Sequence, residues 1–225
     1  MRLQNKFTIL RRWMAVLLVA FSSYSAGAAE GQLRIISAVA SEGVLKFTLG
    51  GKVFNDQGYQ EGEGSGWIGL KTGTHTLKGS HPDHGSLSIP VSLKPGDRKA
   101  VIVFLKSKPP SEVGLPPQRI LRYMTLDCSG GSSSQNKAEK KPATTATLLL
   151  LEAPEPVKFN LGKKEVTLIA GQSQKVEIAR MGLHVSLETS DALSLTTFSL
   201  EEAGDHFAVI FKGVDGTMKA VAFKD

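Results

Sequence analysis

The sequence is poor in cysteine, and this excludes an internal disulfide. Its 225 residues include one cysteine, Cys128, whereas a bridge within the chain takes two. Ser129, Gly130 and Gly131 follow it, so we expect an exposed thiol on a flexible stretch, either incidental or paired with a second chain. A catalytic thiol is not expected, because nothing in such a stretch would hold a histidine beside it.

Catalytic and cofactor motifs are also missing. The chain contains neither the G-x-S-x-G elbow of serine hydrolases nor the H-E-x-x-H of zinc proteases. Residues 64–69 match G-x-G-x-x-G, but they lead into a segment typical of a strand, whereas a dinucleotide site must open a helix. Glu61 and Glu63 are interpreted as solvated charges of a Gly-rich loop and not as the facing carboxylates of a glycosidase. We therefore expect no enzymatic activity and no cofactor.

Long hydrophobic runs are scarce, and the one near the N-terminus is short. Met14–Phe21 is apolar, follows four basic residues, and precedes a small-residue stretch that ends in Ala26-Gly27-Ala28. This order predicts a signal peptide over residues 1–28 that is removed; a buried N-terminal helix is the alternative. The run is shorter than the roughly 20 residues that a membrane-spanning helix needs, and no later stretch is long enough. We expect a periplasmic, cell-surface or secreted protein with no stable membrane span.

Excess positive charge is small in the chain that remains. Four of the 27 Lys and Arg and none of the 21 Asp and Glu lie in residues 1–28, which leaves 23 basic and 21 acidic residues and a net charge of about +2. Nucleic-acid binding requires basic charge that is clustered on a folded domain. The one short basic run, Lys137–Lys141, lies in a segment without apolar periodicity, so no nucleic-acid partner is expected.

Residues 128–145 divide the chain in two. They are rich in Ser, Gly and Lys, which is typical of a flexible linker. We therefore predict a first domain over residues 29–127 and a second over residues 146–225. The two resemble each other, which indicates an internal duplication. The matching segments are Leu45–Lys52 with Val157–Lys164, residues 86–97 with 192–205, Ala100–Phe104 with Ala208–Phe211, and Ile120–Asp127 with Met218–Asp225.

Both predicted domains show the pattern of β-strands. Apolar and polar residues alternate over short stretches, for example at Leu45, Phe47 and Leu49. Turn-forming pairs such as Gly50-Gly51 separate these stretches, and no window has the period of an amphipathic helix. We predict an all-β protein with two small antiparallel, immunoglobulin-like β-sandwiches of six to seven strands each, joined by the flexible linker.

One cluster of side chains offers ligands for a metal ion. His75, His81, Asp83 and His84 supply three imidazoles and a carboxylate, which suit a transition metal. His75 lies in a predicted strand, and the other three lie in the turn that follows, from which they could face back towards it. The alternative interpretation is an ordinary hairpin turn, in which Pro, Asp and Gly are common.

Two aromatic residues, Tyr59 and Trp67, are candidates for ligand binding. Trp67 is the one tryptophan that remains after removal of the predicted signal peptide. Strand alternation places it on the face opposite Ile68. An exposed Trp67 could stack on sugar rings, while the alternative is that it fills the core.

Several of these strand and turn patterns carry a resemblance. They are Leu33–Ala38, Leu45–Lys52, Gly66–Leu77 and Ser88–Asp97. The chain resembles bacterial exported tandem β-sandwich domains of unknown function, in which a Tyr is usual where His75 stands here. It also resembles the periplasmic accessory proteins of alginate O-acetylation, which pair two small β-sandwiches behind a signal peptide. No functional residue carries over from either group.

The resemblance implies a non-enzymatic binding or adaptor protein that assists in making or modifying an exopolysaccharide. Its expected partner is an envelope protein or a polysaccharide. Metal binding through the histidine cluster and a structural role as a cell-surface spacer are the alternatives.

Overall fold

A computed structural model describes residues 30–109, 118–128, 144–153, 155–161, 164–178, 185–189, 195–198 and 204–224. The predicted signal peptide, residues 1–28, lies outside the described residues. So does most of the predicted linker, residues 129–143.

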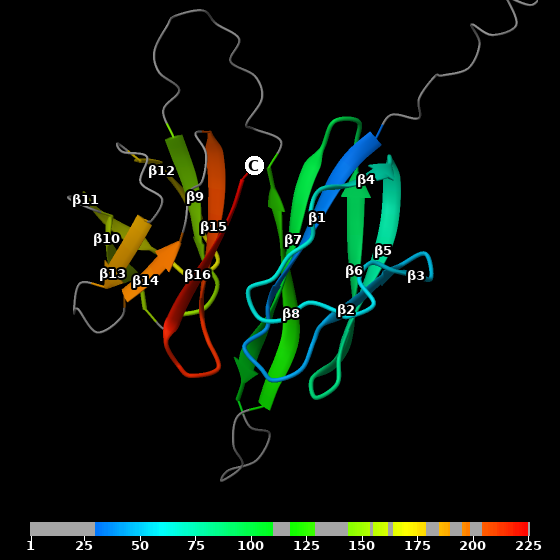
Figure 1. Ribbon diagram of the computed structural model, residues 1–225, viewed down its shortest axis with the longest axis horizontal. Coiled ribbons are helices and arrows are strands. Elements are labelled where there is room, and N and C mark those ends of the chain that lie inside the picture. Colours follow the sequence, from blue (N-terminus) through cyan, green and yellow to red (C-terminus); the bar gives the residue numbers. More distant parts are fainter. Residues whose placement is uncertain are drawn as a thin grey trace, which may run out of the picture.

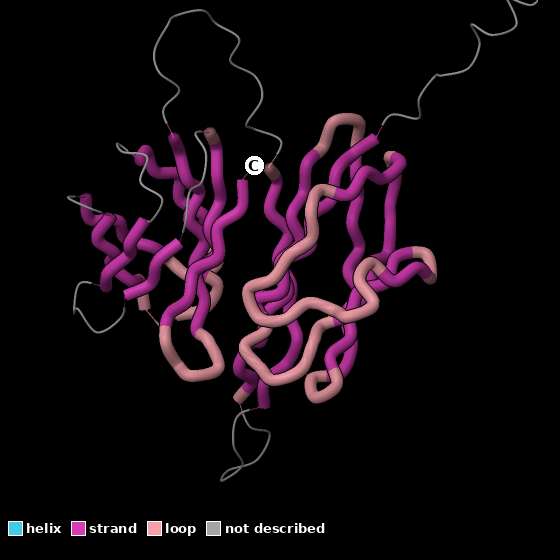
Figure 2. Tube along the Cα trace, in the orientation of Figure 1, coloured by secondary structure: helices cyan, strands magenta, loops and turns pink. Residues whose placement is uncertain are grey.

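The described residues confirm the all-β prediction. They form sixteen strands and no helix (Figure 2). None of them therefore forms a helix that could cross a membrane. The predicted Gly50-Gly51 turn joins two strands, and both glycines have positive φ, of 56° and 81°. A tight hairpin turn requires this conformation, which most other residues avoid.

The first sandwich has eight strands, one or two more than expected. They are β1 (Glu30–Ala38), β2 (Lys46–Leu49), β3 (Lys52–Val53), β4 (Ile68–Lys71), β5 (Gly73–His81), β6 (Gly85–Leu93), β7 (Arg98–Lys108) and β8 (Gln118–Asp127). One sheet has the order β4-β1-β7-β8 and the other β3-β2-β5-β6. The alternating apolar residues of both sheets meet between them, where Phe47, Leu77, Ile89 and Val101 are fully buried.

The second sandwich also has eight strands. They are β9 (Thr144–Leu150), β10 (Val157–Leu161), β11 (Lys164–Leu168), β12 (Ser173–Ile178), β13 (Val185–Thr189), β14 (Leu195–Phe198), β15 (Asp205–Lys212) and β16 (Met218–Lys224). Its sheets have the orders β12-β9-β15-β16 and β11-β10-β13-β14. Phe159, Leu148 and Ile210 belong to the core between them.

The two sandwiches have the same strand order. Each strand of the first, from β1 to β8, occupies the place that the strand eight numbers later occupies in the second. One detail of the prediction is corrected, because the sheets are not purely antiparallel. β1 pairs with β7 in parallel, and β9 pairs with β15 in parallel. In both halves the first strand therefore inserts beside the seventh.

A third apolar core joins the two sandwiches, and we call this contact between them the seam. It lies between the sheet β4-β1-β7-β8 of the first and the sheet β12-β9-β15-β16 of the second, which face each other in Figure 1. Ile36, Ala100 and Ile102 come from the first sandwich, and Leu149, Phe207 and Val209 from the second; all six are at most 2% exposed. The described residues thus form four sheet layers with three apolar cores.

The sequence of the inner strands explains this packing. Residues 100–105 of β7 and residues 207–211 of β15 are buried without interruption, so both faces of each strand are covered. Strands that are apolar on both faces are typical of sheets with a layer on either side. An isolated sandwich would leave one of these faces in water.

This core corrects two sequence-based expectations. Two sandwiches that are merely tethered would have no such contact, whereas here they pack against each other. Cys128, expected on an exposed stretch, is 7% exposed and belongs to the third core. Cys128 directly follows β8 and therefore lies in the seam. Its polar neighbours in sequence did not indicate this position.

A glycine-rich loop of the first sandwich lies close against β16. A Cβ on Gly62 would come within 2.9 Å of Val221 Cγ2. A Cβ on Gly64 would come within 3.0 Å of Phe223 Cε1 and 2.9 Å of the Ile35 carbonyl oxygen. One glycine of the G-x-G-x-x-G match, Gly64, therefore has a packing explanation, because glycine there and at Gly62 lets the loop approach the second sandwich.

The third core predicts that Ile102 contributes to the stability of the whole chain. Ile102→Ala should lower the free energy of unfolding by about 2–5 kcal/mol, the range for a large-to-small change at a fully buried site. The matched control is Ile169→Ala, because Ile169 is 45% exposed. It should change stability by less than about 0.5 kcal/mol. Urea unfolding followed by circular dichroism measures both, and equal effects would contradict the packed seam.

Candidate functional site

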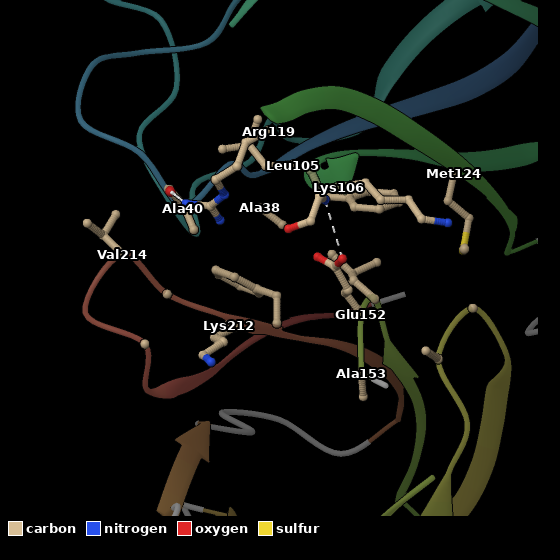
Figure 3. A pocket seen from close by; sticks show the side chains of 18 residues that line it. Ala38, Ala40, Leu105, Lys106, Arg119, Met124, Glu152, Ala153, Lys212 and Val214 are labelled. Atoms are coloured by element: carbon tan, nitrogen blue, oxygen red, sulfur yellow. Dashed lines mark hydrogen bonds between the residues drawn. The ribbon is translucent and has the colours of Figure 1, made fainter. Parts of the chain in front are cut away.

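The candidate binding site is a cleft at one end of the seam between the two sandwiches. Its volume is about 730 Å³, and both sandwiches contribute to its lining (Figure 3). Small-molecule sites usually occupy roughly 300–1,000 Å³ and are often found between domains. The cleft therefore has the size and the location of a ligand site.

The floor of the cleft is apolar and continues the third core. Phe104 of β7 and Phe211 of β15 line it, together with Met124 of β8 and Leu151 after β9. Both phenylalanines are less than a tenth exposed. Beyond them the lining becomes charged: Lys106 shares the face of Phe104, and Lys212 comes next after Phe211 at the end of β15. The cleft opens where the apolar contact between the sheets ends.

Three cationic side chains line the cleft, namely Lys106, Arg119 and Lys212 (Figure 3). Arg119 is held in place because its Nη1 donates to the carbonyl oxygen of Ala40 at 3.0 Å. Within the part of the chain that the structure describes, none of the three forms an ion pair. Among the lining residues that the structure describes, the one carboxylate is Glu152, which accepts from the Ser107 backbone N–H across the seam at 3.4 Å. These described lining residues together carry a formal charge of +2.

The predicted histidine cluster is not assembled as one site. His75 lies near the start of β5 and His81 at its end, six residues apart, which is about 20 Å along a strand. His75 Nε2 lies 2.7 Å from the Lys71 carbonyl oxygen. The structure brings His81, Asp83 and His84 together without His75. Among the described residues no group of three or more His, Cys, Asp or Glu has the placement of metal ligands.

The other two histidines of the predicted cluster, His81 and His84, form a packed pair at and just after the end of β5. Their rings lie 4.8 Å apart between centroids, and His84 Nε2 lies 2.9 Å from Ser41 Oγ. His81 is 4% exposed, and its Nδ1 accepts from the Asp83 backbone N–H at 3.2 Å. Burial lowers the pKa of His81, and the neighbouring His84 lowers it further. Asp83 and the Glu42 backbone raise the pKa of His81, but burial and His84 outweigh them. The lowered pKa favours a neutral His81 in the folded protein.

Tyr59 and Trp67 line one small cavity of about 450 Å³ on the first sandwich. Tyr59 is 7% exposed, and its ring meets that of Phe47 edge-on at 5.9 Å. Burial raises the pKa of the Tyr59 phenol, and Glu63 adds to this shift. Tyr59 is thus largely a core residue, with little surface for a ligand.

Trp67 faces the seam. Ile68 packs on the first core and Trp67 on the third, so the predicted alternation is confirmed. The guanidinium carbons of Arg34 and Arg98 lie 4.6 Å and 4.3 Å from the centre of the Trp67 ring. These cation–π contacts occupy positions that a stacked sugar would need. The ring is therefore part of the packing between the sandwiches.

Glu61 also joins the sandwiches. Its Oε2 accepts from Lys219 Nζ of β16 at 2.8 Å, and its side chain is 17% exposed. This hydrogen bond and the charge of Glu61 raise the pKa of Lys219. The expectation that Glu61 is a freely solvated charge is corrected: its partner lies 158 positions away in sequence.

Sequence reasoning missed the cleft and its three cations. Lys106, Arg119 and Lys212 are isolated in sequence, and the alternation rule cannot show which strands face each other. The unbroken apolar runs of β7 and β15 did carry a signal, since a strand apolar on both faces needs a second covering layer.

Comparisons with known proteins add no assignment. No protein-family model matches the chain. No curated protein matches it either.

The buried His81 predicts a loss of stability in mild acid. Its pKa is lowered in the folded protein, so below about pH 6.5 the unfolded chain binds a proton that the folded chain does not. Stability from this group is present above pH 6.5 and is lost as the pH falls towards the folded pKa. His81→Asn keeps an acceptor for the Asp83 N–H without titrating.

Unfolding free energies measured in urea between pH 7.5 and pH 5 should therefore fall less steeply for His81→Asn than for the unchanged protein. Identical slopes would show that His81 is not held neutral.

Proposed function

We propose that this is an exported, non-enzymatic binding or adaptor protein that assists in making or modifying an exopolysaccharide, and that it binds through the cleft at the seam. The observation that carries the proposal is the cleft itself. It is built by two sandwiches, it has a floor of buried aromatic residues, and its cations have no ion-pair partner among the described residues. Such a concave, mainly apolar site with a few polar groups suits ligand binding.

Further support comes from the sequence. A signal peptide over residues 1–28 would export the chain, and the tandem arrangement resembles that of exported sandwich proteins and of the accessory proteins of alginate O-acetylation. We also infer that the two halves arose by internal duplication, since equal strand order accompanies the four matching pairs of segments.

The alternative of a metal protein has less support, because His75 lies far from the other three candidate ligands. The predicted ligand role of Tyr59 and Trp67 is likewise less favoured than the cleft, since Tyr59 is buried and Trp67 is stacked by two arginines.

A variant that fills the cleft tests the proposal. Ala170 is half-buried and lines the cleft, so Ala170→Trp should obstruct it. The control is Val53→Trp on β3, in the outer sheet, where Val53 is 47% exposed. Co-sedimentation with purified acidic and neutral exopolysaccharides gives the readout.

We expect the unchanged protein and Val53→Trp to bind one class of polysaccharide, and Ala170→Trp to bind at least tenfold more weakly. Equal binding by all three would place the polysaccharide outside the cleft. No binding by any of them would refute the exopolysaccharide role.

A further inference from the structure

The chemistry of the cleft lining indicates more than a general binding site. Its floor consists of aromatic and aliphatic side chains, among them Phe104, Phe211 and Leu151. Its charged groups come from different strands, with Lys106 on β7, Arg119 on β8 and Lys212 on β15. Apolar surface and positive charge are thus adjacent within one concavity of about 730 Å³.

The positive charge is available to a ligand. The side chains of Lys106 and Lys212 make no hydrogen bond or ion pair within the described residues. Arg119 gives one donor to the Ala40 carbonyl oxygen, which leaves further N–H groups of its guanidinium for another acceptor. Glu152 offsets one charge but is engaged with the Ser107 N–H. A negative group in the cleft would meet two or three cations.

The apolar floor sets the second requirement. Phe104 and Phe211 line the cleft and are nearly buried, whereas Met124 is half-buried and Val214 is 52% exposed, so the lining as a whole offers apolar surface to a ligand. A small inorganic anion would leave this surface in water. A ligand with an apolar body would remove it from water, and this burial favours binding.

We propose that the cleft binds an anionic amphiphile, that is, a molecule with an acyl-like apolar body and one acidic head group. The apolar body lies over Phe104 and Phe211, and the acidic group faces Lys106, Arg119 and Lys212. This inference rests on the proposed function in one respect: it takes the cleft as the binding site.

The probe is decanoate, which combines a ten-carbon chain with a carboxylate. Two probes of similar chain length serve as comparisons, neutral decanol below its solubility limit and cationic decyltrimethylammonium below its micelle concentration. Isothermal titration calorimetry with the purified protein measures binding. We expect one decanoate per chain, weaker binding of decanol, and no binding of decyltrimethylammonium. Added salt should weaken decanoate binding, because it screens partly exposed charges.

Charge variants locate the head group. Lys106→Gln with Lys212→Gln should weaken decanoate binding roughly fivefold to tenfold, the loss expected for two partly exposed ionic contacts, and leave decanol binding unchanged. The control pair is Lys52→Gln with Lys78→Gln, which removes the same net charge from exposed positions on the outer sheet. Arg119 is left intact, since it also anchors Ala40.

Each outcome bears on one proposal. Equal binding of all three probes, or no effect of the cleft lysines against the control pair, overturns the anionic-amphiphile inference and leaves the exopolysaccharide role to its own test. Binding of decanoate that Ala170→Trp abolishes supports the inference even if no polysaccharide binds. Absence of binding for every probe refutes it.

Discussion

The packing of the two inner sheets against each other is the constraint on which the rest of the structure depends. The central strands β7 and β15 are apolar on both faces, so each inner sheet needs a covering layer on either side. Within each sandwich the outer sheet covers one face. The other sandwich covers the second face, and the third core of Ile102, Phe207 and Val209 results. Without it each half would expose a contiguous apolar surface, which monomeric proteins seldom do.

The same seam produces the site. Along the apolar stretch of the seam the two sheets touch, and beyond Phe104 and Phe211, where charged residues such as Lys106 line the space between them, a cleft opens. The third core and the cleft thus lie along neighbouring stretches of the same two strands. A ligand in the cleft contacts both sandwiches, so its binding would add to the free energy that holds them together.

Several residues whose chemistry suggested a site have structural roles instead. Trp67 is stacked by Arg34 and Arg98, and Glu61 pairs with Lys219 across the seam. An exposed aromatic ring and a buried one, or a free carboxylate and a paired one, look alike in sequence. The distinction depends on partners that are far away along the chain. The close approach of Gly62 and Gly64 to β16 is of the same kind, since glycine at both positions serves the packing of the loop against the second sandwich.

The sequence by itself determined that the chain forms β-strands separated by turns, and which face of a strand is apolar, because a period of two and the turn preference of glycine are local properties. Leu45 and Phe47 are core residues, and Gly50-Gly51 is a turn, as the pattern predicts. The tertiary structure alone decided that β1 lies parallel to β7, that Cys128 is buried, and that three separate cations line one cleft. These features depend on how the sheets pair and pack against one another. Contacts between residues that are far apart in sequence decide this, and local sequence patterns do not reveal them.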